Sequence, residues 1–137
     1  MTDEERESAL ADVVRTWGEL AFSRLFAPSG GDRFARSWAA YSRAAASPSS
    51  AAALSRANLT TDIRGLLHRV QVPTLVLSRR SDEIGPPKAA RYMAERIQGA
   101  RFVELEGEDH VMWVGDIETL CTEIERFVSA PVAASRA

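Results

Sequence analysis

The 137-residue sequence has one cysteine, no surplus of basic residues and no long apolar run. The lone Cys121 excludes an intrachain disulfide and argues against a zinc site built on cysteines. It suits a reducing compartment, so we expect a cytoplasmic protein. Lys and Arg number 17 against 19 Asp and Glu, which gives a net charge of −2. Because no cationic surplus is available to neutralise phosphates, a nucleic-acid partner is not expected.

Signals for membranes, cofactors and metals are missing as well. The first ten residues, MTDEERESAL, lack the basic start and apolar core of a signal peptide. No apolar run approaches the length that crosses a bilayer. The sequence contains no phosphate-binding loop and no dinucleotide fingerprint. The acids Glu106, Glu108 and Asp109 offer too few metal ligands and are interpreted as solvated loop charges. We therefore expect no cofactor, no metal and no membrane partner.

What remains is the composition of one ordinary globular domain, 45% hydrophobic and 26% charged. Residues 1–70 have the apolar spacing of helices, and Gly18 divides the first helical stretch in two. The turn PSGGD (28–32) follows, with Asp32 as the expected cap of the next helix. Ser47 and Pro48 then have the cap-and-proline order of another helix start. This block contains no convincing strand.

Residues 71–130 have the pattern β-α-β-α, and residues 131–137 are predicted to be a frayed tail. VPTLVLS (72–78) is a short β-branched run, typical of a strand buried on both faces of a parallel sheet. Pro86 or Pro87 opens a helix, and ARFVELEG (100–107) is a second strand. Asp116 is expected to cap a final amphipathic helix. Its inward face would hold Ile117, Leu120, Cys121, Ile124 and Phe127.

Two strands joined by a helix lie parallel with a right-handed crossover, so the loops that follow them open at the same edge of the sheet. Open α/β sheets place their sites at this carboxyl edge. Asp82 lies in the first loop and His110 in the second. An acid can orient an imidazole there, and the imidazole can take a proton from a hydroxyl nucleophile. The alternatives are that Asp82 only forms a turn and that His110 is an ordinary loop residue.

These residues resemble a known family. VPTLVLSRRSDEIGPP, followed by GARFVELEGEDHVMW and an amphipathic helix, looks like the C-terminal part of an α/β-hydrolase. The resemblance implies that Asp82 is the catalytic acid and His110 the catalytic histidine. It is strong over about residues 60–130 and looser over the helical block, which resembles a lid. The subtype is similar to bacterial hydrolase-like domains found beside cyclase or regulatory domains. One departure is Arg79, where many members have glycine; we expect it to stiffen the approach to Asp82.

The other departure is larger. The family's nucleophile elbow, Gly-x-Ser-x-Gly, is absent from the sequence. Ser78 and Ser81 lie near the predicted site but not on an elbow, and Ser81 and Trp113 are candidate pocket residues. Cys121 is interpreted as a small core residue, and His68 as the end of a short helix.

The expected fold class is α/β: a partial α/β-hydrolase fold with two parallel strands instead of the family's larger sheet. Because such a pair exposes an apolar strand edge, we expect a homodimer or a second chain that supplies the missing half. Two functions stay open. In one, the chain is a serine-type hydrolase portion acting on an ester or similar acyl substrate, inactive alone because it lacks the nucleophile. In the other, it is a non-catalytic remnant that dimerises or binds a partner or a small apolar ligand.

Overall fold

The computed structural model describes residues 2–130, and the predicted tail 131–137 lies outside the described residues. The chain divides into two compact units between Ile63 and Arg64. Within residues 2–130, no helix has both the length and the apolar character needed to cross a membrane.

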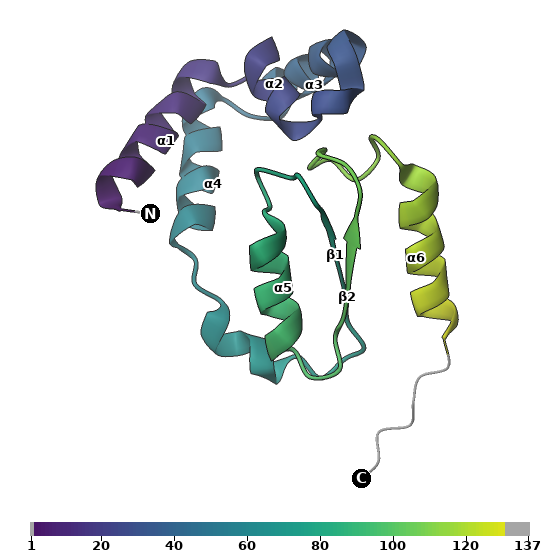
Figure 1. Cartoon of the computed structure of the whole chain (residues 1–137). Helices are drawn as coiled ribbons and strands as arrows, with labels where there is room; N and C mark the ends of the chain where they lie inside the picture. Colours follow the sequence, from purple (N-terminus) through teal and green to yellow (C-terminus); the bar gives the residue numbers. More distant parts are fainter. Residues whose placement is uncertain (1, 131–137) are drawn as a thin grey trace. The chain divides into compact units, whose positions relative to one another are not determined.

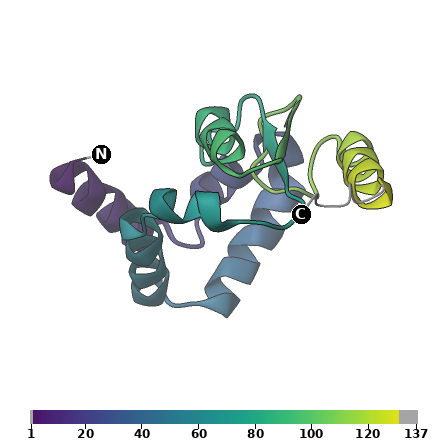
Figure 2. The same cartoon turned by 90° about the horizontal axis from the view of Figure 1, so that it is seen from below.

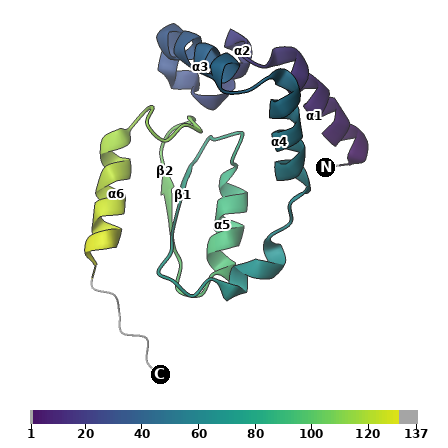
Figure 3. The ribbon, with the colours of Figure 1, turned by 180° about the vertical axis from the view of Figure 1, so that it is seen from behind.

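The first unit is entirely helical. Helix α1 packs against α4, and α2 packs against α3 (Figures 1 and 3). The elements in chain order are α1 (Asp3–Thr16), α2 (Leu20–Phe26), the 3-10 turn η1 (Pro28–Gly30), α3 (Gly31–Ala45) and α4 (Pro48–Thr60). The break between α1 and α2 falls at Gly18, which has a φ of +78° that favours glycine. The predicted division of the first helical stretch is therefore confirmed.

Of the two helix caps predicted in this unit, one is confirmed and the other is wrong. Ser47 caps α4, because its hydroxyl accepts a hydrogen bond from the Ser50 amide at 3.1 Å. The prediction that Asp32 caps α3 is wrong. The 3-10 turn runs directly into the helix, so the cap falls on Gly30 and Asp32 lies in the first helical turn. The Asp32 carboxylate instead forms an ion pair with Arg24.

The second unit contains η2 (Arg64–Arg69), β1 (Leu75–Arg79), α5 (Pro87–Arg96), β2 (Arg101–Leu105) and α6 (Ile117–Ser129). The two strands are parallel, with Leu75 opposite Arg101 and Arg79 opposite Leu105. Helices α5 and α6 lie on opposite sides of the strand pair (Figures 1 and 2). The predicted β-α-β-α order with two parallel strands is confirmed.

Strand β1 is shorter and less covered than its sequence predicts. It begins at Leu75 rather than Val72, which is 66% exposed. Pro73 has no N–H to donate, and pairing with β2 begins where the Arg101 amide donates to the Thr74 carbonyl at 2.9 Å. Residues 75–77 are only half-buried, so the strand is not covered on both faces within the part of the chain that the structure describes.

Helix α6 begins at its predicted cap, where Asp116 accepts from the Thr119 amide at 3.0 Å. Its predicted inward face is wrong in part. Leu120 is buried, but Ile117, Cys121 and Ile124 are exposed. A buried carboxylate, Glu123, takes a place on the covered face and pairs with Arg101 at 2.5 Å and with Arg126 at 2.7 Å. A sheet of two strands is also too narrow to cover a full apolar helix face.

Candidate functional site

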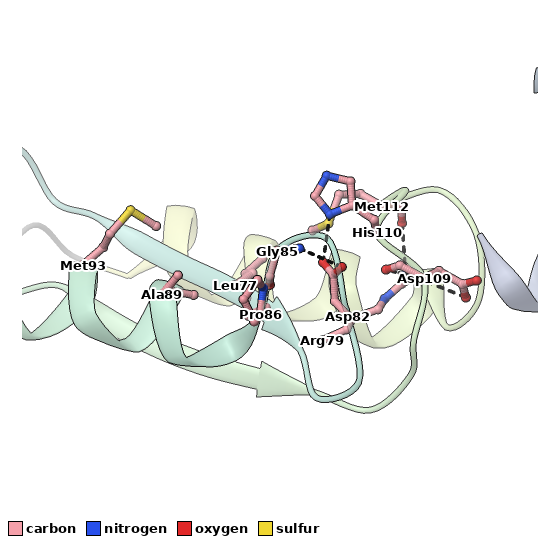
Figure 4. A pocket seen from close by; sticks show the side chains of 12 residues that line it. Leu77, Arg79, Asp82, Gly85, Pro86, Ala89, Met93, Asp109, His110 and Met112 are labelled. Carbon is pink, nitrogen blue, oxygen red and sulfur yellow. Dashed lines mark hydrogen bonds and ion pairs between the residues drawn. The ribbon is translucent and has the colours of Figure 1, made fainter. Parts of the chain in front are cut away.

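The site is formed by the two loops that follow β1 and β2. Backbone hydrogen bonds hold these loops together beyond the strands: the Arg80 amide donates to the Leu105 carbonyl at 2.9 Å, and the Ser81 amide donates to the Gly107 carbonyl at 3.0 Å. The side chains of Asp82 and His110 meet just beyond this point (Figure 4). His110 Nδ1 lies 2.8 Å from Asp82 Oδ2. The structure thus brings together the two residues that the sequence assigned to one sheet edge.

Asp82 is both a turn former and the partner of the histidine. Its Oδ1 atom accepts hydrogen bonds from the amides of Ile84 and Gly85, each at 2.9 Å, while Oδ2 faces the imidazole. The side chain is only 9% exposed. The local turn therefore fixes the carboxylate so that one oxygen is left for His110. The turn-forming role and the histidine-orienting role of Asp82 are therefore parts of one arrangement.

The charged form of Asp82 is favoured in this setting. Burial raises the pKa of the carboxyl, but the hydrogen bonds from the Gly85 amide, His110 and the Ile84 amide outweigh burial, so the pKa lies below its ordinary value. A charged carboxylate only accepts hydrogen bonds. It therefore requires Nδ1 of His110 to be the donor, which leaves Nε2 as the proton acceptor of the neutral ring. In Figure 4, that second ring nitrogen points away from Asp82.

A cavity of about 310 Å³ opens beside this pair. Leu77, Ala90 and Met93 give it an apolar wall from β1 and α5. Asp82 and His110 stand at its polar end (Figure 4). An apolar cavity with few convergent polar groups is the usual form of a small-molecule site.

The candidate pocket residues from the sequence do not line this cavity. Ser81 and Trp113 are both exposed and are not among the lining residues. Ser78 and Met112 line the wall instead. The Ser78 hydroxyl makes a long 3.5 Å hydrogen bond to the Gly85 carbonyl.

Gly85 is a site residue that the sequence analysis missed. A Cβ atom at this position would lie 3.1 Å from Asp82 Oδ2 and 3.3 Å from His110 Nδ1. Any side chain here would therefore crowd the hydrogen bond between the two residues. The available signal was a glycine immediately before Pro86 in the loop that carries Asp82.

Asp109 was interpreted as a solvated charge, and that interpretation is wrong. Both Asp109 and Arg79 have side chains that are 2% exposed, and Arg79 Nη1 lies 3.4 Å from Asp109 Oδ2. No spacing rule predicts this pair, since the two residues lie 30 positions apart in the sequence.

The other candidates lie away from the cavity. His68 is exposed in η2, and Cys121 is exposed on α6 rather than part of a core. Among residues 2–130, no three or more His, Cys, Asp or Glu side chains are grouped so as to hold a metal ion.

A parallel β-α-β unit with an acid after the first strand and a hydrogen-bonded histidine after the second is the C-terminal arrangement of an α/β-hydrolase. A family model described as TAP-like protein, one of the α/β-hydrolase families, matches residues 41–132. The match covers most of the chain. The chain belongs to this family.

Relatives and similar structures agree with this assignment. Rhodomycin D methylesterase DnrP of Streptomyces peucetius is 40% identical over 58 residues, which are 42% of this chain and 20% of that protein. A pimeloyl-[acyl-carrier protein] methyl ester esterase of Neisseria meningitidis is 31% identical over 67 residues, which are 49% of this chain and 26% of that protein. The structure of the esterase EaEST from Exiguobacterium antarcticum matches 95% of this chain and 49% of that chain, with a TM-score of 0.79 and 23% identity. The chain thus corresponds to about half of that fold.

Proposed function

We propose that this chain supplies the acid and the histidine of a serine-type α/β-hydrolase that acts on an ester or a similar acyl substrate. The observation that carries the proposal is the 2.8 Å contact between Asp82 and His110 at the carboxyl edge of the strands, beside a largely apolar cavity. In the proposed reaction, Asp82 holds the ring in the tautomer that presents Nε2 to the substrate side. The nucleophilic hydroxyl comes from a polypeptide segment outside this sequence, because the sequence contains no Gly-x-Ser-x-Gly elbow.

The proton movements follow from this geometry. The external hydroxyl gives its proton to His110 Nε2 while its oxygen bonds to the acyl carbon. The ester C–O bond then breaks, and the leaving alcohol takes the proton from His110. Water repeats the sequence on the acyl intermediate and releases the acid. Throughout, the negative charge of Asp82 stabilises the imidazolium.

The substrate class rests on the relatives. Two of them are methyl ester esterases by name. An apolar wall formed by Leu77, Ala90 and Met93 would accept the hydrocarbon part of such an acyl group. We therefore favour the methyl ester, or the ester of another small alcohol, of a largely apolar acid.

Activity of the chain alone is the first test. The purified protein should hydrolyse an activated ester such as p-nitrophenyl acetate no faster than its His110→Ala variant, since the nucleophile and the oxyanion donors supply most of the rate enhancement. Saturable turnover that Ser78→Ala or Ser81→Ala abolishes would overturn the proposal and reveal a different active site.

A chimera provides the positive test. The half of EaEST that this chain matches would be replaced by residues 2–130, so that the esterase supplies its own nucleophile half. A folded chimera should hydrolyse esters and lose roughly 10²–10⁴-fold in kcat with His110→Ala. Ser81→Ala is the matched control and should keep full activity. A folded chimera whose slow turnover is the same with and without His110 would contradict the proposal.

We also propose that the chain associates through β1 and α6, either with a second copy or with the chain that carries the nucleophile. Two features favour this: β1 pairs only with β2 among the described residues, and α6 exposes Ile117, Ile124 and Val128 in one row. Light scattering at several concentrations should show a mass above that of one chain. A monomer at every concentration, which also stays monomeric when mixed with a nucleophile half, would exclude this association.

A further inference from the structure

The loop that carries His110 is wrapped around one arginine side chain. Arg79 is the last residue of β1, and its side chain is 2% exposed. Its Nη1 donates to the Asp109 carbonyl at 3.1 Å, and its Nη2 donates to the Met112 carbonyl at 3.3 Å. A longer bond of 3.4 Å joins Nη1 to the Val111 carbonyl. The guanidinium thus contacts the carbonyl of the residue before His110 and the carbonyls of the two residues after it.

The charge of this arginine is balanced inside the loop itself. Asp109 Oδ2 lies 3.4 Å from Arg79 Nη1, and both side chains are buried. A buried ion pair is weak evidence for stability, because removing two charges from water offsets much of their attraction. The planar guanidinium, in contrast, can hold several acceptors in fixed directions. Its position therefore favours a role in fixing geometry.

The loop has a glycine at each end, and both glycines fit closely against the ion pair of Arg79 and Asp109. Gly107 has a φ of +115°, and a Cβ there would lie 3.3 Å from Arg79 Cδ. Gly115 has a φ of +78°, and a Cβ there would lie 2.7 Å from Asp109 Oδ2. Backbone of this kind is unfavourable for other residues, and the space is already filled. The loop closes on Arg79 at both ends.

We infer that Arg79 is the positioning residue of the histidine. By holding the carbonyls of residues 109, 111 and 112, it fixes the backbone on both sides of His110 and keeps Nδ1 within 2.8 Å of Asp82 Oδ2. The consequence for catalysis rests on the proposed function, because an imidazole misplaced by about 1 Å can lose on the order of 10²-fold in rate. The geometric claim does not require any hydrolysis to be observed.

The test measures the tautomer of His110 in the whole protein by long-range ¹H–¹⁵N NMR, at about pH 8.5, well above the titration range of an ordinary imidazole. His110 should show the Nδ1–H form that a charged Asp82 requires. His68, the other histidine and an exposed one, provides an internal reference in the same spectrum. This readout is independent of ester hydrolysis, so its failure is distinguishable from failure of the proposed function.

Three variants separate positioning from simple stability. Arg79→Lys keeps the charge beside Asp109 but cannot hold three carbonyls in a planar fork. The double variant Arg79→Met with Asp109→Asn removes both buried charges together, which buried pairs often tolerate. Arg80→Met is the matched control, since this neighbouring arginine is exposed and pairs with Glu104 and Glu106.

We expect Arg79→Lys and the double variant to remain folded by circular dichroism while the His110 signals move to the tautomer ratio shown by His68. Arg80→Met should leave them unchanged. A folded variant of either kind with the wild-type His110 signals would overturn the inference. Loss of the fold in both would also overturn it, because the pair would then be needed for folding the unit rather than for placing the histidine.

Discussion

Replacing Asp82 by asparagine changes the one side chain that connects both loops of the site. The carboxylate accepts three hydrogen bonds, from the amides of Ile84 and Gly85 and from His110. A hydrogen bond to a charged group contributes about 1.5–3 kcal/mol and a neutral one about 0.5–1.5 kcal/mol. Losing the charge therefore costs about 1 kcal/mol for each bond. Because the asparagine avoids the cost of burying a charge, we expect a net loss of about 1–3 kcal/mol at neutral pH.

The pH dependence of this loss has a definite sign. Burial raises the pKa of Asp82, but the bonds from Gly85, His110 and Ile84 lower it further, so the folded pKa lies below the ordinary value of 3.8. A depressed folded pKa stabilises the protein above the unfolded pKa, and that stabilisation is lost as the pH falls through the folded value. The difference between wild type and Asp82→Asn should thus be complete at neutral pH and shrink below about pH 4.

Urea denaturation followed by circular dichroism at about pH 7 and about pH 3 gives both free energies of unfolding. Glu83→Gln is the matched control, since this carboxylate lies in the same loop but is exposed. It should change the free energy of unfolding by less than about 0.5 kcal/mol. An Asp82→Asn variant as stable as the wild type at neutral pH, or equally destabilised at both pH values, would show that the carboxylate is not held as the structure describes.

Three further predictions concern the loops and helices around the site. Gly115→Ala should destabilise the second unit by about 1–3 kcal/mol in urea denaturation, because a positive φ is combined with a clash against Asp109. Gly99→Ala, with a φ of +73° and open space around it, should cost less, and equal losses would refute the clash. Ser47→Ala should cost about 1 kcal/mol by removing the cap of α4, whereas Ser47→Asp should restore it, and an unchanged urea midpoint in the alanine variant would contradict this role. The exposed thiol of Cys121 should react with a thiol reagent in the folded protein nearly as fast as in urea, and protection in the folded protein would contradict its exposure.

The elements were predictable where local chemistry decides them. Ser47 followed by Pro48, and Asp116 ahead of an apolar run, start helices through hydrogen bonds that span only three residues. The order of strand and helix after residue 71 follows from the change of apolar period in the sequence. Asp32 failed as a cap because the preceding turn already had helical geometry, which the identity of a single residue does not reveal.

The two principal site residues were also predictable, for a topological reason. Parallel strands joined by a helix open their following loops at the same edge, so Asp82 and His110 were expected to share that edge of the sheet. The cavity wall was not predictable in the same way. Whether Ser78 or Ser81, and Met112 or Trp113, lines the cavity depends on the local backbone direction at each position, which the identity of a single residue does not reveal.

Helix α6 shows what the periodicity of apolar residues cannot predict. Its apolar residues recur at helical intervals, which identifies the apolar face but not how much of that face its own unit covers. Here Leu120 is buried, whereas Ile117, Cys121 and Ile124 are exposed. The exposed apolar residues of α6 indicate a binding partner, because globular domains rarely expose a continuous apolar row without one. It supports the same proposal of association as the open edge of β1.

Arg79 shows that some features of the site depend on tertiary packing and cannot be predicted from local sequence rules. In the sequence it is only a charged residue at the end of an apolar strand. In the structure, its side chain lies inside the loop that carries His110 and contacts the backbone on both sides of the histidine. The structure explains the role of each neighbouring residue: the glycines at 107 and 115 permit the close turn, and Asp109 balances the charge of Arg79. None of these residues predicts the arrangement alone, since the partners are joined only by the packing of two loops about 30 residues apart. A charged residue at one strand end is therefore best interpreted together with the loop that follows the neighbouring strand.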